Sequence, residues 1–349
     1  MSHSSASALL SPVRISTDSL RDEMLGRQLS VNTVGCQEQQ FFERLEGRHV
    51  IIGVPDDRGV ALNLGHTGAA SGPEAFRQAF YRLYDVRLQD GTWCGSRWVD
   101  MGDLILRDDI GETHSRLAEA VQKILAAGAA RVYVIGGGHD FSFGSYAGHA
   151  KSCQGTLPLV NFDAHFDLRP VNEGVINSGT PFRRVIENLG HRISDGRSLF
   201  EIGIQRERNP QSLWDYAMAK GVSVAEYTAG RKPWIFWNTQ TDSNRSLVEQ
   251  VSEWLANQAR EKGFSGHLHL SVDLDVFHLA AAIGTSASTS FGLPVETLWP
   301  CVEDVLSRKM CRVVDVAELC PARDCQSQTA RFAAALVFRG GLSLESSVR

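Results

Sequence analysis

The sequence predicts an α/β fold in which a single domain is built on a mainly parallel central sheet with helices on both faces. From His49 onwards, short runs rich in β-branched residues alternate with amphipathic stretches. Such alternation over roughly 300 residues is typical of strand–helix units whose strands pair in parallel. Most of the runs are continuously apolar, as expected for strands that helices cover on both sides. The chain of 349 residues is long enough to bury such a core.

Six strands and six helices are expected along this domain. We place the strands at 49–54, 131–135, 157–162, 199–204, 267–272 and 311–316. We place the helices at 73–84, 112–127, 210–220, 245–262, 295–308 and 326–338. Glu74, Glu112 and Glu296 lie near the starts of three of these helices, where an acidic side chain is favourable.

Three regions depart from this pattern. The run 267–272 alternates polar and apolar residues, so its polar face is expected to be less deeply buried. The stretch 225–243 holds Gly230 and Pro233 among aromatic residues and is expected to be a loop insertion. Residues 1–45 are expected to form a partly flexible N-terminal arm, with a helix near 18–29, before a catalytic domain at 46–349.

The charge and the cysteines exclude several classes of partner. The formal net charge is −5 and no block of basic residues occurs, which argues against a nucleic-acid or anionic-membrane partner. No apolar run approaches the roughly 20 residues that span a bilayer. The N-terminus is a poor secretory signal. Seven cysteines without a CxxC pair favour neither a disulfide framework nor a zinc site, so we expect a reducing, cytoplasmic location.

Potential metal ligands follow three of the expected strands. One strand leads into three glycines and a histidine, one into an Asp-Ala-His-Phe-Asp run, and one into Asp-Leu-Asp. Side chains two positions apart in an extended segment point the same way, and ligands collect at the carboxyl ends of parallel strands. The candidate ligands are His139, Asp163, His165, Asp167, Asp273 and Asp275.

These residue types favour two divalent cations. A lone Asp-x-Asp is more often a helix cap or a turn acceptor, but the three motifs together, each at a strand end, favour a metal site. Four carboxylates in one pocket would repel one another strongly without cations, and a site rich in carboxylates suits Mn²⁺ better than thiolate-preferring metals. Two such ions can lower the pKa of a shared water and present hydroxide to an electrophilic carbon. The glycine run lacks the Lys-Ser/Thr of a phosphate loop, and we expect it to allow close approach of the backbone to the metal centre.

In this order, the three motifs resemble the ureohydrolase superfamily of arginase, agmatinase and formimidoylglutamase, over residues 48–340. This resemblance implies one arginase-like α/β domain and two Mn²⁺ ions per chain, although Fe²⁺ or Co²⁺ would suit the same ligand types. It implies that His139, Asp163, Asp167 and Asp273 hold one ion and that Asp163, His165, Asp273 and Asp275 hold the other. Asp163 and Asp273 would bridge the ions, and Glu318 would face the cationic group of the substrate, so these three are the expected catalytic residues.

The finer similarity is to the formimidoylglutamase branch, through the segments 53–73 and 177–182, the third glycine before His139, and the run 273–277. Ser178 stands where arginase and agmatinase usually have a histidine, which makes those two activities less favoured. The implied reaction is the hydrolysis of N-formimidoyl-L-glutamate to L-glutamate and formamide, a step of histidine degradation. Asn177, Ser178 and Arg183 (or Arg184) are the candidate substrate-binding residues, since the two carboxylates of the substrate need cationic or amide donors.

Other hypotheses remain open. A guanidino compound or agmatine, with urea as product, would use the same metal centre. A non-catalytic relative would be expected to lack ligands, and all six are present. A histone-deacetylase-like amide hydrolase would use one zinc and different motifs. The resemblance also implies a homo-oligomer, a trimer or a hexamer.

Overall fold

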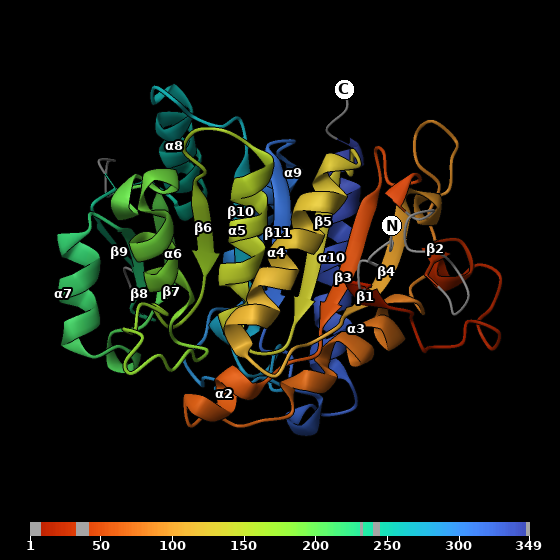
Figure 1. Cartoon of the computed structure of the whole chain (residues 1–349), viewed down its shortest axis with the longest axis horizontal. Coiled ribbons are helices and arrows are strands. Elements are labelled where there is room, and N and C mark those ends of the chain that lie inside the picture. Colours follow the sequence, from red (N-terminus) through yellow and green to blue (C-terminus); the bar gives the residue numbers. More distant parts are fainter. Residues whose placement is uncertain (1–7, 33–41, 231–232, 240–244, 347–349) are drawn as a thin grey trace, which may run out of the picture.

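The computed structural model describes residues 8–32, 42–230, 233–239 and 245–346. Within them one sheet runs through the molecule in the order β1-β4-β3-β5-β11-β10-β6-β7-β8-β9, and β2 also pairs with β4 (Figure 1). Its strands are β1 (Leu10–Ser11), β2 (Ser30–Val31), β3 (His49–Val54), β4 (Trp98–Leu104), β5 (Arg131–Gly136), β6 (Leu159–Phe162), β7 (Leu199–Ile204), β8 (Ser223–Tyr227), β9 (Trp234–Trp237), β10 (Leu268–Asp273) and β11 (Cys311–Ala317). Only β1 and β9, at the two edges of this described sheet, pair antiparallel to their neighbours.

Helices cover both faces of the sheet, as the sequence predicts (Figure 1). The helices are α2 (Arg58–Leu62), α3 (Gly72–Phe80), α4 (Ile110–Ala126), α5 (Ser142–Ser152), α6 (Pro181–Leu189), α7 (Gln211–Ala219), α8 (Leu247–Arg260), α9 (Val295–Ser307) and α10 (Gln328–Ser346). On one side α4 contacts α5 and α5 contacts α6; on the other, α10 lies between α3 and α9, and α9 contacts α8. The α/β fold with a mostly parallel sheet is therefore confirmed.

The continuous apolar runs are explained by this double cover. In β3, Ile51 packs into the core that includes α3 and α10, whereas Val50 and Ile52 pack with residues of α4. A strand whose successive side chains point to opposite buried faces needs apolar residues at every position. All six expected strands are present, within two residues of the expected limits.

Several elements differ from the expectation. The strand β4 and the helices α5 and α6 were not expected, and 225–243 is no plain loop, because β8 and β9 pair antiparallel there as a hairpin. Of that stretch, residues 231–232 and 240–243 lie outside the described residues. The alternating strand β10 is buried at every position, so its polar face is not less buried than its apolar face.

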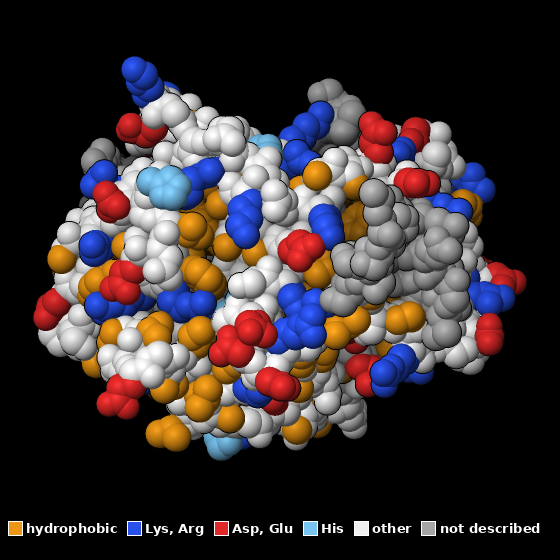
Figure 2. Space-filling view, viewed as in Figure 1, with side chains coloured by type: hydrophobic (Ala, Val, Ile, Leu, Met, Phe, Trp, Pro, Cys, Tyr) orange, Lys and Arg blue, Asp and Glu red, His pale blue; other side chains and the backbone are white. Residues whose placement is uncertain are grey.

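The N-terminal segment contributes to the sheet. β1 pairs with the last residues of β4 and β2 with its first ones, while the described part of 18–29 holds a single 3₁₀ turn, Leu25–Arg27, in place of the expected helix. Residues 1–7 and 33–41 of the expected arm lie outside the described residues, and the division at residue 45 stays a prediction. No helix among the described residues is long and apolar enough to cross a membrane. Figure 2 shows basic and acidic described side chains interspersed over the face in view, without an extended patch of one sign.

Candidate metal centre

Four neighbouring strands in the middle of the sheet end at the candidate site. β5, β11, β10 and β6 are adjacent, and their carboxyl ends carry His139, Glu318, Asp273 and Asp163, of which Asp273 is the last residue of β10. Because parallel strands end at the same edge of a sheet, side chains far apart in the sequence meet here. The fold thus brings the three sequence motifs to one place.

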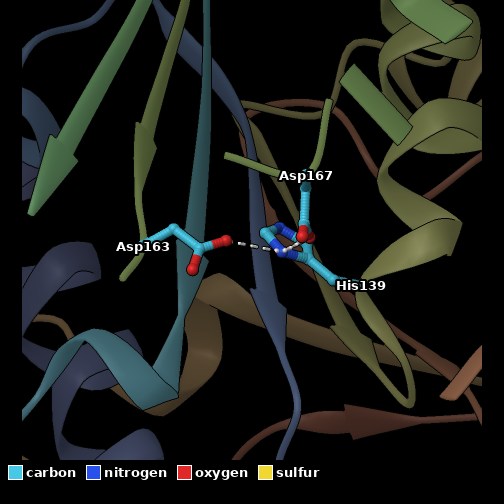
Figure 3. Close-up of side chains that lie close together, drawn as sticks. All are labelled: His139, Asp163 and Asp167. Atoms are coloured by element: carbon cyan, nitrogen blue, oxygen red, sulfur yellow. Dashed lines mark ion pairs between the residues drawn. The ribbon is translucent and has the colours of Figure 1, made fainter. Parts of the chain in front are cut away.

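His139, Asp163 and Asp167 form the first group (Figure 3). Nδ1 of His139 lies 3.2 Å from Oδ2 of Asp163 and 2.9 Å from Oδ2 of Asp167. Oδ2 of Asp273 also lies 3.3 Å from this nitrogen. Three carboxylate oxygens therefore surround one imidazole nitrogen, at separations that a shared cation could bridge.

Asp163, His165 and Asp275 form the second group, so Asp163 belongs to both. Nδ1 of His165 lies 3.4 Å from Oδ1 of Asp163 and 3.1 Å from Oδ2 of Asp275. An aspartate that serves two adjacent groups is what a bridging ligand requires. This arrangement fits the bridging role expected for Asp163, which stays a prediction until an ion is located.

Local hydrogen bonds fix how these side chains point. Oδ1 of Asp163 accepts from the backbone N–H of His165 at 2.7 Å, and Oδ1 of Asp273 accepts from that of Asp275 at 2.8 Å. Nε2 of His139 lies 2.8 Å from Oγ of Ser271 on β10, which leaves Nδ1 facing the carboxylates. A partner on the far ring nitrogen is the usual way in which a protein orients a metal-binding histidine.

Burial and mutual repulsion perturb the acids of the site. Burial, and then the charge of Asp163, raises the pKa of Asp167 to about 6. Burial and the neighbouring Asp275 raise the pKa of Asp273 well above its usual range. Burial by itself would lower the pKa of His139, but the nearby carboxylates of Asp163, Asp167 and Asp273 raise it well above its usual value. A proton and a metal cation would compete for this position, because both neutralise the same carboxylates.

Three buried polar atoms of the site test whether it fits a metal. Nδ1 of His139, Oδ2 of Asp163 and Oδ1 of Asp275 have no hydrogen-bond partner among the described residues. Buried polar atoms are normally paired, and those that are not call for an explanation such as an ion. The carboxylate-rich donor set suits a hard or borderline divalent cation such as Mn²⁺. The residues present therefore fit the expected metal.

Glu318 lies directly after β11 and faces the same cavity. Its Oε1 accepts from the backbone N–H of His139 at 2.8 Å, and its Oε2 accepts from the hydroxyl of Ser286. Its φ of 66° lies in the left-handed region, which is costly for a residue with a Cβ and often marks a functional constraint. Burial and Asp273 raise the pKa of its carboxyl group well above the usual value.

A cavity of about 190 Å³ opens over the acidic cluster. Its lining includes His165, Asp167, Asp273, Asp275, Glu318, Ser178, Asn63, Arg169, Arg208, Ser286 and Ala287. Of the candidate substrate-binding residues, Ser178 lines it and accepts a hydrogen bond from Nδ2 of Asn63 at 2.9 Å. Asn177 is not part of this lining; its Oδ1 accepts from the backbone N–H of Gly179 within its own turn.

The two arginines expected to bind carboxylates lie elsewhere. Arg183 pairs with Glu187 one helical turn along α6 and stacks over Tyr216. Arg184 is buried, where its Nη1 lies 2.8 Å from Nδ1 of His114 and its guanidinium covers the ring of Phe143. The cations that do line the cavity are Arg169 and Arg208.

The sequence contains features that could have identified both of these arginines. Arg169 stands two residues after Asp167, and Arg208 follows the carboxyl end of the correctly expected strand β7. The glycine run also packs closely against other parts of the chain, and its expected close approach to the metal centre stays a prediction. A Cβ at Gly137 would lie 1.8 Å from the carbonyl oxygen of Asp56, and one at Gly136 would meet the ring of Phe141. These glycines therefore allow close packing of the backbone against neighbouring segments of the chain.

Comparison with known proteins agrees with the fold and identifies the family. The model of the arginase family matches residues 48–340. The formimidoylglutamase of Rhodococcus jostii (strain RHA1) is 34% identical over 299 residues, which cover 84% of this chain and 85% of the relative. That of Klebsiella pneumoniae (strain 342) is 31% identical over 309 residues, 88% of this chain and 89% of the relative.

Solved structures share the architecture. The crystal structure of formimidoylglutamase from Bacillus subtilis matches with a TM-score of 0.77 at 22% identity and covers 97% of both chains. A Trypanosoma cruzi formiminoglutamase solved with two Mn²⁺ ions matches with a TM-score of 0.72 at 23% identity, over 93% of this chain and 99% of that one. With its metal-site-like groups of His and Asp at the strand ends, the chain is a hydrolase that belongs to the arginase family.

Proposed function

We propose that this chain hydrolyses N-formimidoyl-L-glutamate to L-glutamate and formamide. The observation that carries the proposal is that two arginines, Arg169 and Arg208, line the same cavity as the acidic cluster and Glu318. The substrate has a cationic amidine at one end and two carboxylates at the other, so it needs an acidic wall and a basic wall in one cavity. Identities of 31–34% to formimidoylglutamases over more than four-fifths of the chain support the same substrate.

The residues of the cavity suggest how the substrate is held. Glu318 is buried and oriented by two donors, so its carboxylate is placed to accept from the N–H groups of the amidinium. Arg169 has no ion pair or side-chain hydrogen bond within the described parts of the chain, and its guanidinium is available for a carboxylate of the substrate. Two bound Mn²⁺ ions, held by the six Asp and His residues, would supply the nucleophile from water.

Hydrolysis adds water across the C–N bond between the formimidoyl carbon and the glutamate nitrogen. Oxygen joins the carbon, the C–N bond breaks, and the nitrogen leaves as the amine of glutamate with a proton. Glu318 is expected to stabilise the cationic amidine as the reacting carbon becomes tetrahedral, because two hydrogen bonds hold its carboxyl group in place before the reaction. Ser178 and Asn63 form a neutral, hydrogen-bonded part of the wall.

The test is product analysis with the Mn²⁺-loaded protein. N-formimidoyl-L-glutamate, agmatine and a series of guanidino acids are offered separately, and formamide, urea and glutamate are assayed. Formamide and glutamate in equal amounts, absent with Glu318→Gln, support the proposal. If a guanidino acid yields urea and N-formimidoyl-L-glutamate yields no formamide, the proposed substrate is wrong and the guanidino-compound alternative takes its place. The proposed metal centre would be unaffected by this result.

A further inference from the structure

The segment 284–289 forms one wall of the cavity and joins its two ends. Ser286 and Ala287 line the cavity beside Glu318 and Arg208. The segment follows the turn after β10, and it is fastened both to the chain after β11 and to the chain after β7. It is therefore placed to link the residue proposed to bind the amidine with an arginine proposed to bind a carboxylate.

At its first end, the segment is held against the β11 side. The backbone N–H of Cys320 donates to the carbonyl of Gly284 at 2.8 Å, and the N–H of Gly284 donates to Oγ1 of Thr329 at 2.8 Å. Thr285 forms an antiparallel bridge with Leu319, the residue after Glu318. The backbone of Glu318 and that of the segment are thus held side by side.

At its second end, the segment is held by side chains that follow β7. Arg208 donates from Nη1 to the carbonyl of Ala287 at 3.1 Å and from Nη2 to that of Ser288 at 3.4 Å. The hydroxyl of Thr289 donates to Oε1 of Gln205 at 3.2 Å. A guanidinium has five N–H donors, so Arg208 keeps others with which to bind an anion in the cavity.

Between these two ends, Ser286 reaches Glu318. Its hydroxyl donates to Oε2 of Glu318, opposite the N–H of His139 that holds Oε1. Ser286 is 6% and Glu318 5% exposed, so water competes little for this bond. The backbone of Glu318 is in the left-handed region. The hydrogen bonds on both of its carboxyl oxygens fix the orientation of its side chain.

We propose that Ser286 is a positioning residue that couples the carboxylate end of the substrate to Glu318. This inference rests on the proposed function. A substrate carboxylate that binds Arg208 orders the guanidinium, the guanidinium orders the carbonyls of Ala287 and Ser288, and Ser286 then holds Glu318 in line with the amidine. Binding of the distant carboxylate in this way helps to align Glu318 with the amidine at the reacting carbon. It should therefore raise kcat as well as lower KM.

The experiment compares the full substrate with two shorter ones. N-formimidoyl-4-aminobutyrate lacks one carboxylate and N-formimidoyl-L-2-aminobutyrate lacks the other. For the Mn²⁺-loaded wild-type protein we expect kcat to fall by about tenfold or more with at least one of them, beyond the rise in KM. In Ser286→Ala the kcat of the full substrate falls to nearly that of the shorter one, so the ratio of the two approaches one. Ser286→Thr, which keeps a hydroxyl, is expected to restore the ratio.

Ser290→Ala is the matched control, because Ser290 is an exposed serine four positions along the chain. It should keep the wild-type ratio. An unchanged ratio in Ser286→Ala overturns the coupling while formamide production by the wild-type protein upholds the proposed function. If the wild-type protein releases urea from a guanidino acid, the same ratio is measured with that acid and its decarboxylated analogue.

Hydrogen exchange gives a readout that does not need turnover. L-Glutamate, the expected product, is added as the probe, and amide exchange is followed in peptides that contain 284–289 and Glu318. We expect slower exchange in both peptides for the wild-type protein, in neither for Arg208→Gln, and only in the 284–289 peptide for Ser286→Ala. Slower exchange at Glu318 in Ser286→Ala equal to that of the wild type would contradict the proposal.

Discussion

Two buried groups of acids in this molecule differ in where their compensating cation comes from. On β4, Asp100 is fully buried, and Arg77 from α3 donates to it from Nε at 2.8 Å and from Nη2 at 3.1 Å. Tyr81 and the backbone N–H of Gly102 complete its hydrogen bonds. Burial by itself would lower the pKa of Arg77, but the carboxylates of Asp100 and Asp103 raise it far above its usual value. The chain itself supplies the cation for this group.

The acids at the ends of β6 and β10 have no such partner. Among the described residues, the ion pairs of Nδ1 in His139 and His165 are all with aspartate carboxylates, and three buried polar atoms of the site lack hydrogen bonds. This difference indicates how buried acids can be interpreted. Acids that are paired with an arginine have a structural role, whereas acids whose neighbours are only histidine nitrogens indicate a site for an external cation. Both groups appear in the sequence as aspartates within or next to a strand, and the location of the nearest cation is what distinguishes them.

The largest expected effect comes from Asp273→Asn in the second of these groups. The loss of one carboxylate from the shared set should lower activity by more than the roughly 100-fold seen when only supporting groups behind metal ligands are removed. Bound manganese per chain, measured by elemental analysis after gel filtration, should fall as well. The comparison fails if the variant binds two ions with wild-type affinity.

Arg77→Met tests the first group. Removing the cation leaves Asp100 buried and unpaired, which should lower the free energy of unfolding by about 3–5 kcal/mol. Urea denaturation of wild type and variant at one fixed Mn²⁺ concentration measures this loss. If Arg77 has only a structural role, the folded variant should bind as much manganese per chain as the wild-type protein. Loss of manganese from a fully folded variant would contradict the difference between the two groups of acids.

The pH dependence of the metal-free protein sharpens the contrast. The pKa of Asp167 is raised to about 6, so the stability that its protonated form contributes is lost as the pH rises from about 4 through 6. The pKa values of His139 and His165 are also raised, so their contribution is complete below pH 6.5 and is lost as the pH rises through their folded values. These groups should therefore lower the Tm of the metal-free protein as the pH rises from about 4 through 6, and further above pH 6.5, as calorimetry can measure.

Manganese binding should show the opposite trend. Ions replace the protons on the two histidines, so the apparent affinity for Mn²⁺ should increase by about tenfold per pH unit for each proton released. Titration calorimetry in buffers of different ionisation enthalpy counts these protons. An affinity for Mn²⁺ that is independent of pH between 6 and 8 would contradict the assignment of these histidines.

The smallest effect concerns Arg169, a cation in the cavity wall without a partner among the described residues. A charge-assisted hydrogen bond to a substrate carboxylate contributes about 1.5–3 kcal/mol, so Arg169→Gln should raise KM by about tenfold or more. Arg183→Gln is the control, because Arg183 pairs with Glu187 on the helix surface. Equal KM values for the two variants would contradict a specific role of Arg169 and would leave Arg183, the residue expected from the sequence, as an equal candidate.

Sequence reasoning succeeded where a pattern is local. The six strands were found because most of them are continuous apolar runs, and the ligand motifs because they come at the ends of those strands. It missed β4, since Asp100, Gly102 and Asp103 make that strand look polar. The cation that allows these acids to be buried, Arg77, stands more than twenty positions earlier in the chain.

It missed α5 for a related reason. The sequence of this helix is rich in glycine and serine, which have lower helix propensities than alanine or leucine. A Cβ at Gly144 would lie 2.6 Å from the carbonyl of His114, and one at Gly148 would lie 2.5 Å from that of Ala118, both on α4. Close packing of two helices needs these glycines, and only the folded chain reveals the neighbour. The same holds for Arg169 and Arg208, whose role depends on which side of the cavity each one faces.

Asp167 and Glu318 hold left-handed backbone conformations, with φ of 49° and 66°. Such a conformation costs about 1–3 kcal/mol for a residue with a Cβ, and glycine relieves it. A library of variants selected for heat resistance alone is therefore expected to accumulate glycine at these two positions and to lose the reaction as it gains stability. Engineering of a more durable enzyme from this chain should keep both positions fixed and seek its gains elsewhere.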